Sequence, residues 1–295
     1  MSRRLWIAAK APRAGLAKTR LARDLGEAAA LDVYRGFLRD LAARLRGAPF
    51  PLGWYVTPAD AWDDLAPLVG GADPAPRVLD QGDGDWTVRQ RRLLGGAGER
   101  GEGRIVLISS DSPQVRVETI EDAFDQLEHR DVVLGPVLDG GYYLIGMRGW
   151  HDVLDGVVMS TSSVYQNILT RCRALGCSVG LVETLFDVDQ ADELRRLVAL
   201  LPGRDDLSAT RAALERHGLV QSSGPAAPDA GTRGTRRVGR RSGDAETPAP
   251  IWTPSPLRCA QGRLYPLPEG EGTRKGRHAP VGPLADAALN PSVAP

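Results

Sequence analysis

The chain is poor in cysteine and histidine, with three cysteines and four histidines among 295 residues. Cys172, Cys177 and Cys259 form no Cys-x-x-Cys pair and are not interleaved with histidine, which argues against a disulfide framework and a zinc site. No histidine has the neighbours of a nucleophilic triad, and Gly-x-Ser-x-Gly is missing, which disfavours hydrolase chemistry of that kind. Free thiols fit a reducing compartment, so we expect a cytoplasmic protein.

The chain also lacks net charge and long apolar runs. Its 37 Lys and Arg residues balance 37 Asp and Glu residues, so composition gives no reason to expect nucleic acid or an anionic membrane as partner. No segment approaches the roughly 18 apolar residues of a membrane-spanning helix. The apolar run Leu5–Ala9 is too short for a signal peptide. We therefore expect no nucleic-acid partner and no membrane span. Any anion site must come from a local group of cationic side chains, and nothing in the sequence indicates an oligomeric state.

Composition changes abruptly after about Val220. Residues 221–295 carry 12 of the 22 prolines, 10 of the 34 glycines, and a cluster of five arginines between Arg233 and Arg241. Such a segment buries too little apolar area to offset its ordering entropy, so we predict a disordered tail. The alternative, a basic arm for nucleic acid, is disfavoured because the arginines are interrupted by Gly and Thr with hardly any aromatic residues.

Before that point, short apolar runs alternate with helical patterns, which predicts a single α/β domain over residues 1–220 with a mostly parallel sheet. The expected strands are residues 5–9, 53–57, 77–79, 104–109, 131–134, 141–147 and 178–183. The expected helices are residues 27–46, 59–69, 87–94, 118–129, 161–175 and 190–201. The strand at 141–147 follows its turn so closely that an antiparallel partner is expected for it.

The loop after the first strand, residues 10–21, is the best candidate anion site. It places Lys10, Gly15, Lys18 and Arg20 between a strand end and a helix N-terminus, where backbone N–H groups, the helix dipole and cationic side chains favour phosphate. It lacks the spacing of a Walker A motif. A solvated basic loop is the alternative.

Three carboxylate-bearing segments follow other expected strands. Asp111 follows residues 104–109 and could hold a divalent metal against phosphates, or it could cap the next helix or close a turn. Asp187 and Asp189, two apart in extended chain, could face one cation, while Asp189 could instead be the N-cap of the last helix with Asp192 at N3.

The third segment is Asp139-Gly140-Gly141-Tyr142-Tyr143. Its glycines would let backbone approach a sugar or nucleotide, Asp139 could accept a hydroxyl, and a tyrosine could stack on a ring. A plain hairpin turn is the alternative.

Four segments in chain order carry a family resemblance: Lys-Ala-Pro-Arg-Ala-Gly-Leu-Ala-Lys-Thr-Arg-Leu from Lys10, Ser-Ser-Asp-Ser-Pro from Ser109, Asp-Val-Val-Leu-Gly-Pro-Val-Leu-Asp-Gly-Gly-Tyr-Tyr-Leu-Ile-Gly-Met from Asp131, and Asp-Val-Asp-Gln-Ala-Asp-Glu-Leu from Asp187. Over residues 4–200 the chain resembles a bacterial GT-A-fold family of glycosyltransferases of the arsenosugar-biosynthesis type. It is similar to the wider nucleotide-diphospho-sugar transferase superfamily, which includes molybdopterin and phospholactate guanylyltransferases.

The resemblance implies roles for several residues. Lys10, Lys18 and Arg20 would hold nucleotide phosphates, and Asp139 would face the substrate. Asp111, completed by Asp189 with Asp187 as a second candidate, would bind Mg²⁺ or Mn²⁺. The chain departs from the family at Thr87-Val88, where Gly-Glu is usual before the arginine, and at Met159, where Trp is usual.

The expected function is therefore a metal-dependent glycosyltransferase that uses a nucleotide-sugar donor and a small-molecule acceptor. An alternative is a nucleotidyltransferase that takes a nucleoside triphosphate and releases pyrophosphate. It is favoured by the cationic first loop and by Asp-x-Pro in place of the Asp-x-Asp common in glycosyltransferases. A third possibility from another class is a nucleotide-binding protein that the departures leave catalytically impaired.

Overall fold

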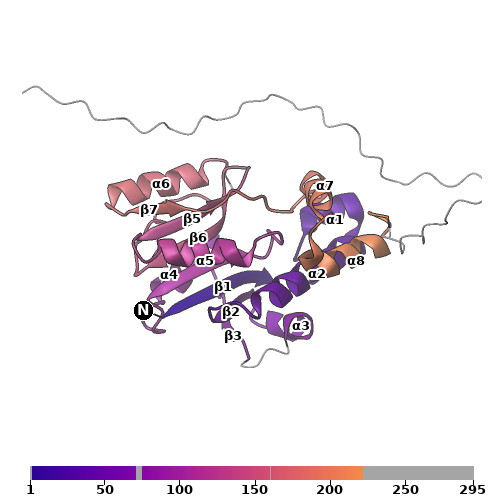
Figure 1. The fold of residues 1–295 in the computed structure, drawn as a ribbon, viewed down its shortest axis with the longest axis horizontal. Coiled ribbons are helices and arrows are strands. Elements are labelled where there is room, and N and C mark those ends of the chain that lie inside the picture. Colours follow the sequence, from indigo (N-terminus) through magenta and orange to yellow (C-terminus); the bar gives the residue numbers. More distant parts are fainter. Residues whose placement is uncertain (1, 71–74, 160, 222–295) are drawn as a thin grey trace, which may run out of the picture. The chain divides into compact units, whose positions relative to one another are not determined.

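The computed structural model describes residues 2–70, 75–159 and 161–221. Within them, seven strands form one sheet in the order β3-β2-β1-β4-β6-β5-β7 (Figure 1). Strand β6 runs antiparallel to β4 and β5, and the other pairings are parallel. The predicted α/β class, the mostly parallel sheet and the antiparallel strand after the Asp139 turn are confirmed.

The strands are β1 Arg3–Lys10, β2 Leu52–Thr57, β3 Arg77–Asp80, β4 Arg104–Ser109, β5 Val132–Pro136, β6 Tyr142–Arg148 and β7 Val179–Leu181. The α-helices are α1 Thr19–Leu25, α2 Glu27–Leu45, α3 Ala61–Val69, α4 Trp86–Gly95, α5 Val117–Gln126, α6 Val164–Ala174, α7 Ala191–Leu200 and α8 Ser208–Arg216, and a 3₁₀ turn, η1, spans Asp205–Leu207. Among these helices, none has the length and apolar character needed to cross a membrane.

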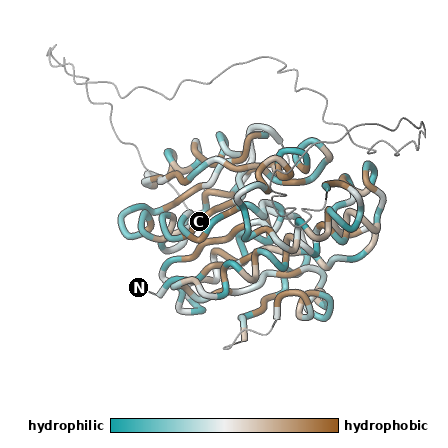
Figure 2. Tube along the Cα trace, turned by 45° about the vertical axis from the view of Figure 1, so that its right-hand side comes forward, coloured by the Kyte–Doolittle hydropathy of each residue, from teal (hydrophilic) through white to brown (hydrophobic). Residues whose placement is uncertain are grey.

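Both faces of the sheet are covered, and side chains alternate between them along each strand. In β1, Leu5 and Ile7 belong to the larger core, which includes apolar side chains of α1, α2, α3, α5, α7 and α8. Trp6 belongs to the second core, to which α4 and α6 contribute. Figure 2 shows the strands as a hydrophobic layer between helices of mixed hydropathy.

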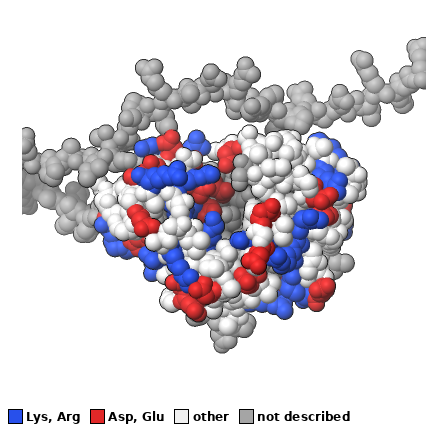
Figure 3. Space-filling view, turned by 180° about the vertical axis from the view of Figure 1, so that it is seen from behind, with Lys and Arg blue, Asp and Glu red and all other residues white. Residues whose placement is uncertain are grey.

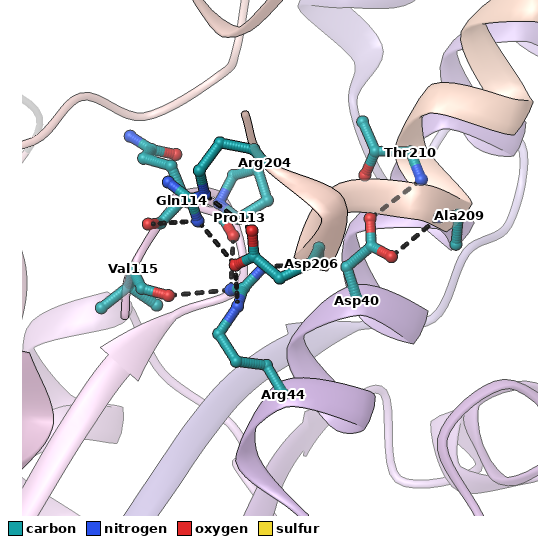
Figure 4. Close-up of polar contacts among 9 residues, drawn as sticks. All are labelled: Asp40, Arg44, Pro113, Gln114, Val115, Arg204, Asp206, Ala209 and Thr210. Carbon is teal, nitrogen blue, oxygen red and sulfur yellow. Dashed lines mark hydrogen bonds and ion pairs between the residues drawn. The ribbon is translucent and has the colours of Figure 1, made fainter. Parts of the chain in front are cut away.

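Two helical segments were not predicted, α1 and the pair η1 and α8. Helix α8 packs on α2 at Gly36, where a Cβ would lie 2.8 Å from the Cα of Thr210. The buried carboxylate of Asp40 in α2 accepts hydrogen bonds at 2.9 Å from the backbone N–H groups of Ala209 and Thr210 (Figure 4). The N-terminus of α8 is therefore capped from another helix, an interaction that local sequence patterns do not reveal.

The predicted tail, residues 221–295, lies outside the described residues apart from Gln221.

Candidate active site

A cavity of about 710 Å³ lies at the carboxyl ends of β1 and β4. Eight of the ten predicted site residues line it: Lys10, Lys18, Arg20, Asp111, Asp139, Gly141, Asp187 and Asp189. Parallel strands bring their carboxyl ends to one edge of a sheet, and ligands of open α/β folds bind there. Figure 3 shows a face of the molecule that is hollowed near its centre, with acidic and basic side chains around the hollow.

Lys18 is the central cation of this cavity. Its side chain is 3% exposed, and its Nζ lies 2.5 Å from Oδ1 of Asp111 and 3.2 Å from Oδ1 of Asp189. The same Nζ donates a 2.8 Å hydrogen bond to the backbone oxygen of Val188. Burial lowers the pKa of Lys18, but the charges of Asp111 and Asp189 outweigh it and raise that pKa above its ordinary value. The ammonium therefore stays charged and joins the segment after β4 to the segment before α7.

The backbone of Lys18 is as unusual as its side chain. Its φ is 52°, the only positive φ of a residue other than glycine in the described part of the chain. The left-handed region is costly for a residue with a Cβ, and such a conformation persists where the surroundings fix it. The three contacts of Nζ, and the rings of Tyr34 and Phe37 at 5.6 and 5.7 Å, supply that fixation.

Asp187 makes a different contact from the other two acids. Its Oδ1 accepts a 2.5 Å hydrogen bond from the hydroxyl of Ser112. Burial, followed by the negative charge of Asp111, raises the pKa of Asp187 to about 7, although the Ser112 bond opposes the shift. Around the buried ammonium of Lys18 the cavity therefore places three acids, Asp111, Asp187 and Asp189, and this local excess of carboxylates attracts a further cation.

The capping alternatives for these acids are wrong. The N-cap of α5 is Arg116, not Asp111. The N-cap of α7 is Gln190, which forms a capping box with Glu193 and leaves Asp189 outside the helix. Asp111 and Asp189 instead share the ammonium of Lys18.

Two of the predicted glycines lie outside the cavity lining. Gly15 has a φ of +69° and donates its N–H to Glu27 at 2.8 Å. Gly140 has a φ of +91°, and a Cβ there would collide with the backbone oxygen of Ser162. These glycines therefore allow a turn and a close backbone approach within the protein itself.

The basic loop is neither fully solvated nor wholly directed at the cavity. Arg13 bonds to Asp60 and Asp64 near the start of α3. Lys10 and Arg20 are exposed and line the cavity, so they and Lys18 are the cations of this loop that line it.

Asp139 lies at the exposed edge of the cavity. Its Oδ1 accepts a 3.0 Å hydrogen bond from the N–H of Gly141, which closes the turn before β6. One carboxylate oxygen is thereby used locally, and the other is available at the cavity entrance.

The acidic side chains have the donor chemistry that Mg²⁺ or Mn²⁺ prefers, since all three are carboxylates. Across residues 2–70, 75–159 and 161–221, no group of three or more acidic, histidine or cysteine side chains is gathered around one ion position. The ammonium of Lys18 contacts Asp111 and Asp189 together. The chemistry of these side chains suits a divalent cation, but the cation that Asp111 and Asp189 contact together is the ammonium of Lys18.

Several residues that line the cavity were not identified as site residues from the sequence. Tyr34 of α2 bonds to the hydroxyl of Ser110 at 3.0 Å, and Asp85, Trp86 and Gln90 enter the lining from the start of α4. The tyrosine was assigned only to the apolar stripe of its helix, because its i, i+3 and i+4 spacing says nothing about where its hydroxyl points. Burial and the charge of Asp111 raise the pKa of Tyr34 to about 12, so its hydroxyl keeps its proton.

Comparison with known proteins gives one family match. The model of the family described as "Uncharacterized protein conserved in bacteria (DUF2064)" matches residues 54–161, which include β4, Asp111 and Asp139. None of the curated proteins compared with the chain matches it.

Among solved structures, the chain is similar to a provisionally named nucleotide-diphospho-sugar transferase from Desulfovibrio desulfuricans G20. The two are 27% identical with a TM-score of 0.65, and the match covers 74% of this chain and 99% of the other.

Two other solved structures are more distant. A cytidylyltransferase from Leptospira borgpetersenii serovar Hardjo-bovis (strain JB197) is 12% identical, with a TM-score of 0.45 and coverage of 73% of this chain and 95% of that chain. A 4-diphosphocytidyl-2C-methyl-D-erythritol synthase from Anaerococcus prevotii DSM 20548 is 11% identical, with a TM-score of 0.45 and coverage of 68% and 96%. These two likenesses are too distant to bear on the function of this chain.

Proposed function

We propose that residues 1–220 form a transferase domain that takes a nucleotide-linked substrate, and that its reaction is the transfer of a glycosyl group from a nucleotide-sugar donor. The observation that carries the proposal is the cavity at the carboxyl edge of the sheet, where buried Lys18 meets Asp111 and Asp189. Support comes from the likeness to the Desulfovibrio protein, whose name states a nucleotide-diphospho-sugar transferase.

The cations of the first loop are proposed to hold the diphosphate. Lys10 and Arg20 are exposed at the cavity, so their side chains can move to phosphate oxygens without breaking the core. The side chain of Lys18 is held by its three contacts, so it supplies a preorganised positive charge to the bound phosphates.

Asp111 and Asp189, with Asp187 beside them, would hold a Mg²⁺ or Mn²⁺ ion together with the phosphates. When bound, the ion would stabilise the negative charge that develops on the leaving diphosphate. Ser112 orients Asp187 by its hydrogen bond, and Lys18 keeps Asp111 and Asp189 turned toward the same point.

Asp139 is proposed to act on the acceptor. It lies at the exposed edge of the cavity with one oxygen engaged by the N–H of Gly141. Its second oxygen can accept a hydrogen bond from an acceptor hydroxyl and take that proton as the hydroxyl attacks the sugar.

Nucleotidyl transfer is the second candidate, and one observation favours it. The loop after β4 supplies a single carboxylate, because the residue two positions after Asp111 is Pro113, whose backbone oxygen is bound by Arg44 at 2.8 Å. A site with a fixed ammonium next to that carboxylate also suits a triphosphate that loses pyrophosphate.

Product analysis separates the candidates. The purified full-length chain is incubated with Mg²⁺ or Mn²⁺ and either nucleotide sugars or nucleoside triphosphates with sugar phosphates. Glycosyl transfer predicts a nucleoside diphosphate released from a nucleotide sugar in the presence of an acceptor. Release of pyrophosphate from a triphosphate would contradict glycosyl transfer and show nucleotidyl transfer instead. Nucleotide binding without any product would show that the chain is a binding protein and not an enzyme.

A further inference from the structure

We infer that the amide of Gln90 is a recognition group of this cavity, which hydrogen-bonds an acceptor oxygen on the uncharged part of the nucleotide-linked ligand. This inference rests on the proposed function, since it assigns a subsite within the same cavity.

The first observation is an unpartnered donor. Gln90 in α4 is 0% exposed and lines the cavity, and its Nε2 has no hydrogen-bond partner among the described residues. Other buried side-chain atoms of the described residues also lack a hydrogen bond, but of the residues that carry such atoms, Gln90 is the one that lines this cavity. A buried donor without a partner costs free energy, so a partner that arrives with the ligand removes that cost.

The second observation is that the amide is held in one orientation. The hydroxyl of Tyr142 in β6 donates a 2.8 Å hydrogen bond to Oε1 of Gln90. Burial raises the pKa of Tyr142 above its ordinary value, so this hydroxyl keeps its proton and remains a donor. With Oε1 engaged, the group that Gln90 has left to offer is the N–H pair on Nε2.

The third observation concerns access. Met159 lies beside the pair, with its sulfur 3.9 Å from the hydroxyl of Tyr142, and both residues line the cavity. An unbranched thioether adapts its rotamer at low cost, so it can make room for a ligand atom at Gln90. Met159 occupies the position at which the family that the sequence resembles usually has tryptophan.

The surroundings define the chemistry of the ligand group. Trp86, Tyr142 and Met159 pack against the second core, so this end of the cavity is apolar and partly aromatic. The guanidinium of the neighbouring Arg89 is engaged by Gly84 at 2.8 Å and by Thr57 and Gln81 at 3.3 Å. The amide therefore faces a ring with a neutral oxygen acceptor, either a nucleobase carbonyl or a sugar hydroxyl, while the phosphates lie toward Lys18.

The test compares the chain with Gln90→Met, which keeps volume and removes the amide. Calorimetric titration uses three probes with Mg²⁺: inorganic pyrophosphate, nucleoside diphosphates (UDP, CDP, GDP and ADP), and sugar conjugates such as UDP-glucose and GDP-mannose. Gln126→Met is the matched control, because Gln126 of α5 bonds to Asp122 and Leu181 and does not line the cavity.

We expect Gln90→Met to weaken one class of probe about fivefold to tenfold, the effect of one neutral hydrogen bond, and to leave pyrophosphate unchanged. A loss of affinity for one nucleoside diphosphate and not for the others identifies a base carbonyl as the partner of Gln90. A loss of affinity confined to the sugar conjugates identifies a sugar hydroxyl. Tyr142→Phe, which frees the amide to rotate, should show the same selectivity with a smaller loss, and it decides the matter if Gln90→Met does not fold.

Unchanged affinities for every probe in the folded variants would overturn the inference and leave Gln90 with a buried water as its partner. Failure of the proposed function has a different signature, since then the unmodified chain would bind neither nucleotides nor pyrophosphate.

Discussion

The Nζ of Lys18 lies 2.5 Å from Oδ1 of Asp111, although 93 positions separate the two residues in the sequence. The pair connects the loop after β1 to the loop after β4, and Asp189 joins it at 3.2 Å. A single buried ammonium therefore sets the geometry of both acids that are proposed to hold the divalent cation.

Replacing Lys18 with Met should weaken nucleoside diphosphate binding about tenfold or more, because one charge-assisted contact is lost and two carboxylates are left without their cation. Titration of a diphosphate with and without Mg²⁺ measures the effect. Arg23→Met, an exposed change in α1, is the control. Equal affinity in Lys18→Met would remove Lys18 from the binding site.

Asp111→Asn should lower metal-dependent nucleotide affinity while leaving the fold intact, since Asp111 caps no helix. The amide keeps a hydrogen-bond acceptor for Lys18 but loses the negative charge that a divalent cation needs. Circular dichroism and nucleotide titration with Mn²⁺ check both statements. Asp192→Asn, on the exposed start of α7, should change neither, and unfolding of Asp111→Asn would show a structural role instead.

Much of this architecture follows from sequence patterns, for physical reasons. The continuous apolar run that contains Leu5, Trp6 and Ile7 predicts a strand that is buried on both faces. The residues that follow parallel strands of this kind meet at one edge of the sheet. Asp111, Asp139 and Lys18 each follow such a strand, so their meeting at this edge can be predicted without any knowledge of tertiary contacts.

Pairwise contacts between distant segments could not be obtained in this way. The N-cap of α7 is Gln190 and not Asp189, the candidate from the sequence, because Glu193 completes a capping box with Gln190. The capping of α8 by Asp40 and the bond of Tyr142 to Gln90 depend on how α2, α4 and β6 pack, which no local pattern encodes.

Gly140→Ala tests whether a predicted ligand-binding glycine is required by the fold. The added Cβ would collide with the backbone oxygen of Ser162, and the φ of +91° is unfavourable for alanine. The substitution should therefore lower the free energy of unfolding by more than about 1 kcal/mol. Gly149→Ala is the matched control, with a φ of +73° and open space around the Cβ. Urea denaturation should show the larger loss for Gly140→Ala, and equal losses would contradict the collision.

Acid should weaken the contact between α2 and the segment before α8. Asp206 bonds to Arg204 and Arg44, which lower its pKa in the folded state, while Arg44 also holds the backbone oxygens of Pro113 and Val115 (Figure 4). A carboxyl whose folded-state pKa is lowered stabilises the fold above its unfolded value of 3.8, and that stability is lost as the pH falls toward the folded value.

The free energy of unfolding should therefore fall more steeply below about pH 4 in the unmodified chain than in Asp206→Asn, which has no charge to lose. Urea titrations at pH 6, 4 and 3 measure the two slopes. Parallel slopes would show that this ion pair contributes nothing to acid stability.

A crystal structure of the chain with Mn²⁺ and a nucleoside diphosphate, read by the anomalous signal of manganese, would locate both the ion and the phosphates. We expect the diphosphate in the cavity lined by Lys10, Lys18 and Arg20, with the manganese peak between its oxygens and the carboxylates of Asp111 and Asp189. A nucleotide bound elsewhere, for example in the separate pocket lined by Arg4, Arg46 and Arg77, would contradict it.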